Sequence, residues 1–300
     1  MELIVETDIG RDADDFFALC YLAAAGVSIR AITITPGDGD QVAVAKFLVD
    51  YLGLNCEVGV PGTRGKKSVT PFHHEVLQKY GYPLTAEPDG EVGFRVIERA
   101  VCEYRKPVEL FCIGPVTNVK EVLRRTRGRK EPSYFSHATM QGGFCSYDLY
   151  MPTEPLDKFK GMTTCPTFNL NGDKRGGEHF INDERFKRRF VGKNVCHSIV
   201  WDKARLHAMR NAQQVSPNPN SKAINLFMDA AEIYFRKHPE KKFHDPTAAV
   251  CMLHPEVGTY VKGKTYNEKG GWGTRLDPNG DDICVDVDRE KLWQYIYSGT

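Results

Sequence analysis

Five carboxylates lie within ten residues near the start of the chain, directly after a short apolar segment. They are Glu6, Asp8, Asp12, Asp14 and Asp15. Residues 3–6 predict a strand and residues 15–25 predict a helix, so the acidic residues lie where a strand ends and cannot spread freely into solvent. Two carboxylates about 4 Å apart repel each other by ~4 kcal/mol at an effective dielectric constant near 20.

Such repulsion is relieved by protonation or by a bound cation. Arg11 can neutralise only one of these charges, and a hard divalent metal held by oxygen atoms neutralises more of them. The alternative is a solvated acidic loop in which Asp14 or Asp15 caps the following helix. A solvated loop leaves the remaining acids without a role, so the pattern favours a metal site.

The overall charge excludes several classes of partner. Lys and Arg number 40 against 39 Asp and Glu, which leaves a formal charge of +1 and no field that would attract nucleic acid or a membrane surface. The basic run at 124–130 contains no aromatic residue and the run at 185–189 contains a single one, Phe186, so we expect both to be solvated surface. Strand-like sequence begins within three residues and no apolar run approaches the ~20 residues of a membrane span, so we expect a cytoplasmic protein.

The cysteines predict a reducing environment. The chain has nine, an odd number, without a Cys-x-x-Cys pair, and most lie in apolar stretches. We therefore expect reduced, buried thiols and neither a disulfide framework nor a zinc site.

Strand and helix patterns alternate in the first half of the chain. Strands are predicted at residues 3–6, 29–35, 56–60 and 108–113, helices at 15–25, 40–52, 93–104 and 116–124, and a loop at 63–88. The second half predicts strands at 137–142, 194–201 and 283–287 and helices at 222–237, 246–253 and 291–297. This order indicates an α/β fold with an open, mostly parallel sheet and helices on both faces. Without a linker-like segment, residues 1–300 are expected to form a single catalytic domain.

Four further segments follow predicted strands: residues 35–38, 113–118, 167–173 and 243–246. Each alone is as well explained by a turn or a helix cap. Together with the acidic cluster, and in this order, they resemble the inosine/uridine-preferring nucleoside hydrolase family from Glu6 to the end of the chain. The cluster is similar to that family's Asp-x-Asp-x-Gly-x-Asp-x-Asp-Asp pattern, with Glu6 at its first position.

The resemblance implies a calcium-dependent enzyme that hydrolyses the N-glycosidic bond of ribonucleosides and is a homodimer or homotetramer. It implies calcium ligands at Asp8, Asp15, Asp245 and the backbone carbonyl of Ile113. The other residues that the resemblance assigns are Asp14, Asp38, Thr167 and Asn169 on the ribose, His73 and His74 near the base, His244 as acid for the leaving base, and Glu6 and Asp12 as supporting residues.

The reaction suits these residue types. Glycosidic cleavage passes through an oxocarbenium-like state, so it needs a nucleophilic water, anionic surroundings for the sugar and a proton for the leaving group. Calcium would position the water and also bind two ribose hydroxyls. Asp8 would accept the proton of the water, and His244 would protonate the base.

Departures from the family pattern leave the exact activity open. Glu6 replaces an aspartate, Thr167 stands where the family usually has a glutamate, and Lys174 and Arg175 follow soon after. The substrate could therefore be a nucleoside, a 5′-nucleotide or a modified nucleoside. A magnesium-dependent phosphatase and a catalytically weak ribose-binding homologue are also compatible with the sequence.

Overall fold

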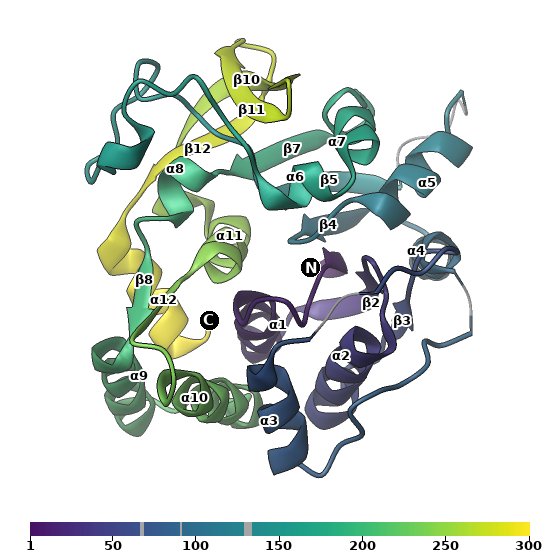
Figure 1. Ribbon diagram of the computed structural model, residues 1–300, viewed down its shortest axis with the longest axis vertical. Helices are drawn as coiled ribbons and strands as arrows, with labels where there is room; N and C mark the ends of the chain where they lie inside the picture. Colours follow the sequence, from purple (N-terminus) through teal and green to yellow (C-terminus); the bar gives the residue numbers. More distant parts are fainter. Residues whose placement is uncertain (67–68, 91, 129–133) are drawn as a thin grey trace.

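A continuous ten-stranded sheet runs through the computed structural model, which describes residues 1–66, 69–90, 92–128 and 134–300 (Figure 1). The strand order is β3-β2-β1-β4-β5-β7-β12-β10-β11-β6. The strands of this sheet are β1 (Glu2–Thr7), β2 (Ser28–Ile34), β3 (Glu57–Gly59), β4 (Val108–Cys112), β5 (Phe135–Gln141), β6 (Thr164–Cys165), β7 (Lys187–Val191), β10 (Gly258–Glu268), β11 (Gly271–Leu276) and β12 (Asp281–Val287).

Neighbouring strands from β3 to β12 are parallel, and β10, β11 and β6 continue the sheet with antiparallel pairs. β8 (Val200–Asp202) and β9 (Glu240–Lys242) form a separate two-stranded antiparallel sheet. The predicted mostly parallel α/β architecture is therefore confirmed.

Helices cover both faces of the sheet (Figure 1). They are α1 (Asp14–Ala24), α2 (Gly39–Leu52), α3 (Pro71–Lys79), α4 (Gly93–Tyr104), α5 (Thr117–Arg125), α6 (Phe168–Gly172), α7 (Lys174–Ile181), α8 (Lys193–Cys196), α9 (Lys203–Val215), α10 (Ser221–Phe235), α11 (His244–Leu253) and α12 (Arg289–Ser298). Side chains alternate across β1, as strand geometry requires. Leu3 and Val5 pack in the core that includes α1, α10 and α11, and Ile4 packs in the core that includes α4 and α5.

Three predictions about elements are wrong. The predicted loop at 63–88 contains α3, whose first residue is Pro71 and whose Val76 and Leu77 are fully buried. Residues 194–201 do not form one strand, because α8 occupies the first part and β8 begins at Val200. Residues 185–189 are not solvated surface, since β7 begins there and Arg188 is only 6% exposed.

The cysteine prediction holds for most of the thiols. All nine cysteines lie in the described part of the chain and are free, and burial is incomplete only for Cys56 and Cys102, the latter exposed. The basic run at 124–130 ends in residues 129 and 130, which lie outside the described residues. Among the residues that are described, no helix combines the length and the apolar character needed to cross a membrane.

Candidate active site

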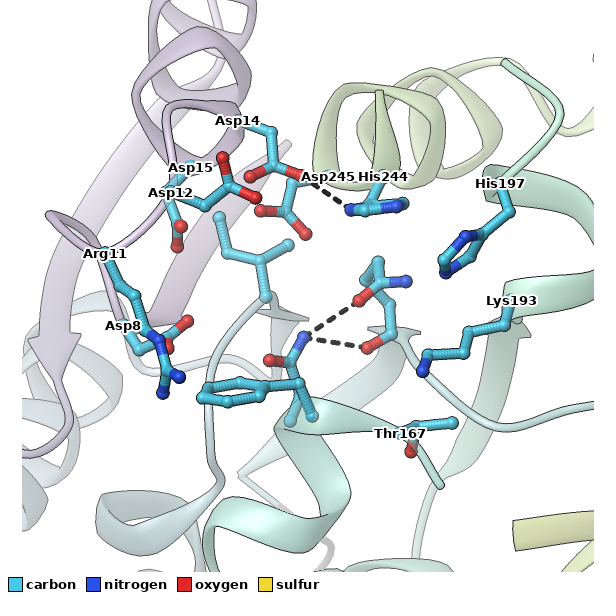
Figure 2. A pocket seen from close by; sticks show the side chains of 14 residues that line it. Asp8, Arg11, Asp12, Asp14, Asp15, Thr167, Lys193, His197, His244 and Asp245 are labelled. Atoms are coloured by element: carbon cyan, nitrogen blue, oxygen red, sulfur yellow. Dashed lines mark hydrogen bonds and ion pairs between the residues drawn. The ribbon is translucent and has the colours of Figure 1, made fainter. Parts of the chain in front are cut away.

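A cavity of about 350 Å³ opens at the carboxyl ends of the central strands. Residues at or just after the ends of β1, β4 and β5 contribute to its walls, together with the first turns of α1 and α11, as expected for a ligand site of a parallel sheet. Its lining residues are Asp8, Arg11, Asp12, Asp14, Asp15, Ile113, Gln141, Thr167, Phe168, Asn169, Lys193, His197, His244 and Asp245 (Figure 2).

Three buried carboxylates from distant parts of the chain meet in one wall. Asp14, Asp15 and Asp245 each offer an oxygen, and these oxygens lie within 4.8 Å of one another. The residues are only 3%, 3% and 4% exposed. Burial raises the pKa of Asp245 well above its usual range, and the charges of Asp14, Asp15 and Asp8 raise it further. This donor set of hard oxygens fits a divalent cation.

Asp8 and Ile113 are also positioned by the carboxyl ends of strands in the sheet. Both line the cavity, Asp8 directly after β1 and Ile113 directly after β4. The Ile113 N–H donates to the Glu6 carbonyl at 2.8 Å, and Gly114 packs so closely that a Cβ there would lie 2.3 Å from the Thr7 carbonyl carbon. Asp8 is not within the 4.8 Å group formed by the described acids, although its charge contributes to the pKa of Asp245.

A buried lysine balances part of this negative charge. Lys241, on β9, is 5% exposed, and its Nζ lies 2.9 Å from Asp12 Oδ2 and 3.4 Å from Asp14 Oδ2. Although burial alone lowers the pKa of Lys241, the carboxylates of Asp14 and Asp12 raise it above its ordinary value. No sequence signal marks this residue, because it lies in a charged run of residues 240–242 that resembles solvated surface.

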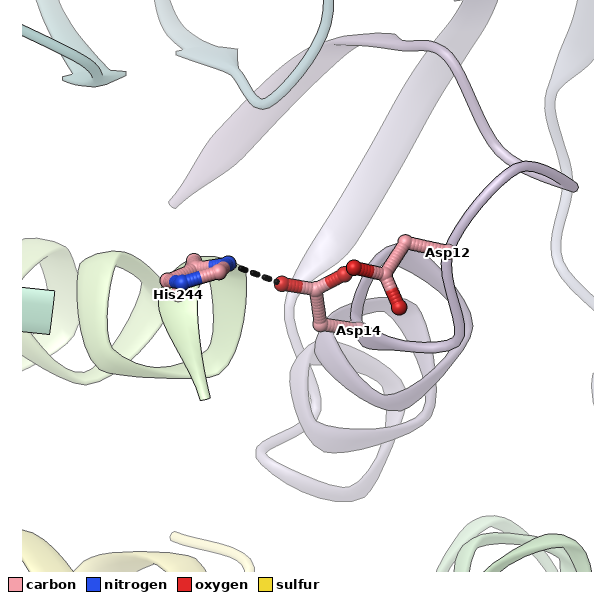
Figure 3. A group of neighbouring side chains, drawn as sticks. All are labelled: Asp12, Asp14 and His244. Atoms are coloured by element: carbon pink, nitrogen blue, oxygen red, sulfur yellow. Dashed lines mark hydrogen bonds and ion pairs between the residues drawn. The ribbon is translucent and has the colours of Figure 1, made fainter. Parts of the chain in front are cut away.

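Asp14 lies between Asp12 and His244 (Figure 3). Its Oδ2 is 3.1 Å from His244 Nδ1. Burial raises the pKa of Asp14, but Lys241 and His244 outweigh burial and lower the pKa below its usual range. The other ring nitrogen of His244, Nε2, is buried and has no hydrogen-bond partner in the described structure. His244 lines the cavity, so this nitrogen is available to a ligand.

Amide and hydroxyl groups form a second part of the wall. Asn169 Nδ2 donates to the backbone carbonyl of Gln141 at 3.0 Å and to its Oε1 at 2.9 Å. Phe168 is 48% exposed, and the Arg11 guanidinium lies 4.2 Å from its ring centroid. Thr167 is 3% exposed and its Oγ1 is buried without a hydrogen-bond partner among the described residues.

Basic side chains gather opposite the acids. Figure 2 shows the Lys193 amine between His197 and Thr167, away from Asp14 and Asp15. The His197 ring lies 4.8 Å from the His244 ring, between centroids, and its Nδ1 is 2.8 Å from Lys158 Nζ. Burial lowers the pKa of His197 to about 3, with further contributions from His244, Lys158 and Lys193. The sequence pointed to none of Gln141, Lys193 and His197. Gln141 is the last residue of β5, whereas Lys193 begins α8 and His197 follows it, so no local pattern relates these positions.

Four predicted residues lie outside the lining of this cavity. Glu6 is fully buried beneath it and accepts hydrogen bonds from Thr33, Thr35 and Asn118. Asp38 accepts a hydrogen bond from the Asp40 N–H at 3.1 Å and caps α2. His73 is buried, and its Nδ1 lies 2.9 Å from Thr70 Oγ1. The Nε2 of His74 lies 3.2 Å from Asp40 Oδ2. Their contacts with a substrate remain predictions.

Known proteins resemble this chain in sequence or in fold over nearly its whole length. A probable uridine nucleosidase 1 of Oryza sativa subsp. japonica is 23% identical over 292 residues, which cover 90% of this chain and 82% of that protein. The inosine-uridine preferring nucleoside hydrolase from Bacillus anthracis aligns with a TM-score of 0.71 at 13% identity, covering 100% of this chain and 99% of that one. A plant nucleoside hydrolase aligns with a TM-score of 0.70 at 17% identity, covering 99% and 98%.

The sequence model of the family described as inosine-uridine preferring nucleoside hydrolase matches residues 3–294. This family is metal-dependent, and the structure has an aspartate-rich group that could hold a metal ion. Its members are N-glycosyl hydrolases, and both the fold and the family support N-ribohydrolase activity. The chain belongs to the inosine-uridine preferring nucleoside hydrolase family.

Proposed function

We propose that this protein is a calcium-dependent N-ribohydrolase that cleaves a ribonucleoside into free base and ribose. The observation that carries the proposal is the meeting of Asp14, Asp15 and Asp245, three buried carboxylates, in a cavity wall at the carboxyl ends of the sheet. Carboxylates this close are unfavourable unless a proton or a cation intervenes. The family match directs the proposal toward glycosidic chemistry rather than toward a phosphatase.

The proposed calcium ligands are Asp8, Asp15, Asp245 and the carbonyl oxygen of Ile113, all of which line the cavity. Calcium accepts six to eight oxygens with tolerant geometry, so carboxylates, a carbonyl and sugar hydroxyls suit it. When bound, the ion would neutralise the carboxylates and supply Lewis-acid character to the site.

Each polar residue of the cavity has a proposed task in the reaction. An oxygen of the Asp8 carboxylate accepts a proton from the attacking water, and Asp14 holds a ribose hydroxyl. Because the His244 Nδ1 faces Asp14, its Nε2 is directed to the ligand and donates a proton to the leaving base.

Further residues bind or support the substrate in this proposal. Asn169 and Thr167 contact the sugar from the wall of the cavity. The remaining assignments are Asp38 on the ribose side, His73 and His74 near the base, and Glu6 and Asp12 as supports for the ligands. The first three require the segments at residues 35–38 and 70–75 to approach a bound substrate.

The proposal extends to the whole protein. Residues 1–300 form a single catalytic domain that works in the cytoplasm in purine or pyrimidine salvage. The partner is a small-molecule nucleoside or nucleotide, without nucleic acid or membrane, and the assembly is a homodimer or homotetramer. The absence of a large net charge, +1 over the chain, supports the exclusion of nucleic acid.

A substrate panel tests the proposal. Purified protein with calcium is incubated with inosine, uridine, adenosine, guanosine and cytidine, and free base is measured by chromatography. We expect base release that falls by more than about hundredfold in Asp8→Ala and Asp245→Ala. The control is Asp157→Ala, because the Asp157 side chain is 89% exposed and lies outside the cavity.

Two results would contradict the proposed activity. Tight nucleoside binding without base release would instead identify a ribose-binding homologue. Base release unchanged in both Asp8→Ala and Asp245→Ala would remove the assigned chemistry from this cavity.

A further inference from the structure

We propose that the cavity binds a ribosyl substrate whose sugar carries a phosphate monoester, and that Lys193 and Thr167 hold this phosphate. The inference rests on the proposed N-ribohydrolase function and names the class of its substrate. The reaction would break the bond between the sugar C1′ and the base nitrogen and form a bond from C1′ to a water oxygen. One proton of the water passes to Asp8, the base nitrogen receives a proton from His244, and the phosphate ester stays intact.

Most charges of the cavity are divided between opposite walls, although Arg11 also lines it, near Asp8 and Asp12 (Figure 2). Asp14, Asp15 and Asp245 occupy the wall built by α1 and α11. Lys193, the first residue of α8, reaches into the cavity from the other side (Figure 2). A ligand that spans this cavity therefore meets a cation site for its hydroxyls at one end and an ammonium group at the other.

The Thr167 hydroxyl supplies an independent sign of a ligand. It lies in the lining, the residue is 3% exposed, and its Oγ1 has no hydrogen-bond partner among the described residues. A buried polar group that is left without a hydrogen-bond partner destabilises the folded protein. A ligand oxygen that accepts from this hydroxyl removes that destabilisation.

The positive charge beside Thr167 also lacks a counter-ion among the described residues. Within the described ranges, no carboxylate forms an ion pair with Lys193 or Lys158. The two lysines are close enough to influence each other, since burial, Lys242 and Lys193 lower the pKa of Lys158. An anionic ligand group near Lys193 would balance this charge, and a lysine ammonium with a hydroxyl donor is a suitable pair for a phosphate.

The position favours the sugar rather than the base as the carrier of the anion. Thr167 is separated by one residue from Asn169, the proposed sugar contact, and both lie in the same part of the lining. Phe168 and Arg11 form another part of the lining, where an aromatic ring and a guanidinium face each other at 4.2 Å. We therefore assign the Lys193 end to the 5′ substituent of the ribose.

The experiment compares uridine with uridine 5′-monophosphate and inosine with inosine 5′-monophosphate, with calcium present and base release as readout. We expect the wild-type kcat/KM to be at least about tenfold higher for the monophosphates. Lys193→Ala is expected to lower the ratio of monophosphate to nucleoside kcat/KM by about 10- to 100-fold, and Thr167→Val to lower it by about 5- to 10-fold.

Lys174→Ala is the matched control, because Lys174 begins α7 and does not line the cavity. It removes the same charge and should leave the ratio unchanged. Orotidine carries its negative charge on the base, so it distinguishes recognition of an anion on the base from recognition of an anion on the sugar. A Lys193-dependent preference for orotidine over the monophosphates would overturn the assignment to the sugar.

A binding measurement makes the test independent of turnover. Calorimetry should show that ribose 5-phosphate binds the calcium-loaded protein more tightly than ribose does, with the difference lost in Lys193→Ala. A preference for unphosphorylated nucleosides, or a ratio unaffected by Lys193→Ala, would overturn this inference and leave the proposed function intact. Absence of base release from every substrate would refute the proposed function, and the ribose 5-phosphate titration would still decide whether the phosphate site exists.

Discussion

At the scale of single residues, Glu6 is a buried carboxyl group whose hydrogen-bond donors among the described residues are neutral. It is fully buried, and its Oε1 accepts from Asn118 Nδ2 and Thr35 Oγ1, both at 3.1 Å. Burial raises the pKa of Glu6 to about 7, despite opposing contributions from the hydrogen bonds of Thr33, Asn118 and Thr35. The residue therefore changes its protonation state near neutral pH.

This shift predicts a pH-dependent stability for the metal-free protein. The pKa of Glu6 rises from an ordinary value of 4.5 to about 7 on folding, so its contribution to stability is present below pH 4.5 and is lost as the pH rises through 7. Glu6→Gln keeps the shape but cannot ionise. Between pH 4.5 and pH 8, the free energy of unfolding of wild type relative to Glu6→Gln should fall by about 3 kcal/mol.

Denaturant unfolding in the presence of a chelator measures this difference at each pH. Asp157→Ala serves as a control, because Asp157 is an exposed acid whose loss should leave no such trend. A difference between wild type and Glu6→Gln that stays constant over this range would contradict the assigned burial of a titrating carboxylate.

The acidic residues could be predicted from sequence, whereas the lysine that pairs with them, Lys241, could not. Asp8, Asp12, Asp14 and Asp15 follow an apolar strand, and a strand end fixes their position. Lys241 has no such local signal, since its burial depends on which face of the short strand β9 meets α1. Such contacts depend on tertiary packing rather than on neighbouring residues.

At the scale of elements, an ion pair joins the start of β7 to β12 in the interior. Arg188 Nε lies 2.9 Å from Asp281 Oδ2, and the Arg188 N–H donates to Asp281 Oδ1 at 3.1 Å. Arg188 Nη1 also donates to the carbonyl of Phe180, at the end of α7, at 2.7 Å. One side chain thus connects two strands and a helix.

Removal of this arginine predicts a large loss of stability. Arg188→Ala leaves the Asp281 carboxylate buried without its partner, so the free energy of unfolding should fall by about 3–5 kcal/mol. Lys187→Ala removes an exposed cation from the neighbouring position and should change the free energy of unfolding by less than about 0.5 kcal/mol. Chemical denaturation measures both changes. If the two substitutions lowered the free energy of unfolding equally, the prediction for the buried ion pair would be wrong.

Local patterns predicted the elements of the first half better than those of the second half. β1, β2 and β4 are apolar and β-branched, and their order with α1 and α2 already indicates a parallel sheet. β7 has the sequence KRRFV, and its charges suggested an exposed segment. The structure instead pairs Arg188 with Asp281 in the interior. The antiparallel strands β10 and β11 were missed because their apolar patterns are weak. Most of β10 is not buried, and β11, although mostly buried, has two glycines and only two apolar side chains among its six residues.

At the scale of the whole molecule, topology brings the two ends of the sequence together. Asp14 and Asp15 begin α1, whereas Asp245 lies in the first turn of α11, and the two helices pack against each other. The strands that lie between these two helices in the sequence are ordered in the sheet in a way that no local pattern specifies. The family resemblance could anticipate this meeting of residues, but composition and spacing alone could not.

A calorimetric titration of calcium into chelator-treated protein tests whether Asp8, Asp15 and Asp245 share one ion. We predict one calcium ion bound per chain in the wild type and affinity weakened by more than about hundredfold in Asp245→Asn. The substitution relieves repulsion among Asp14, Asp15 and Asp245, so the metal-free variant should remain folded. Absence of calcium binding by the wild type, or equal affinity in Asp245→Asn, would contradict an ion shared by Asp8, Asp15 and Asp245.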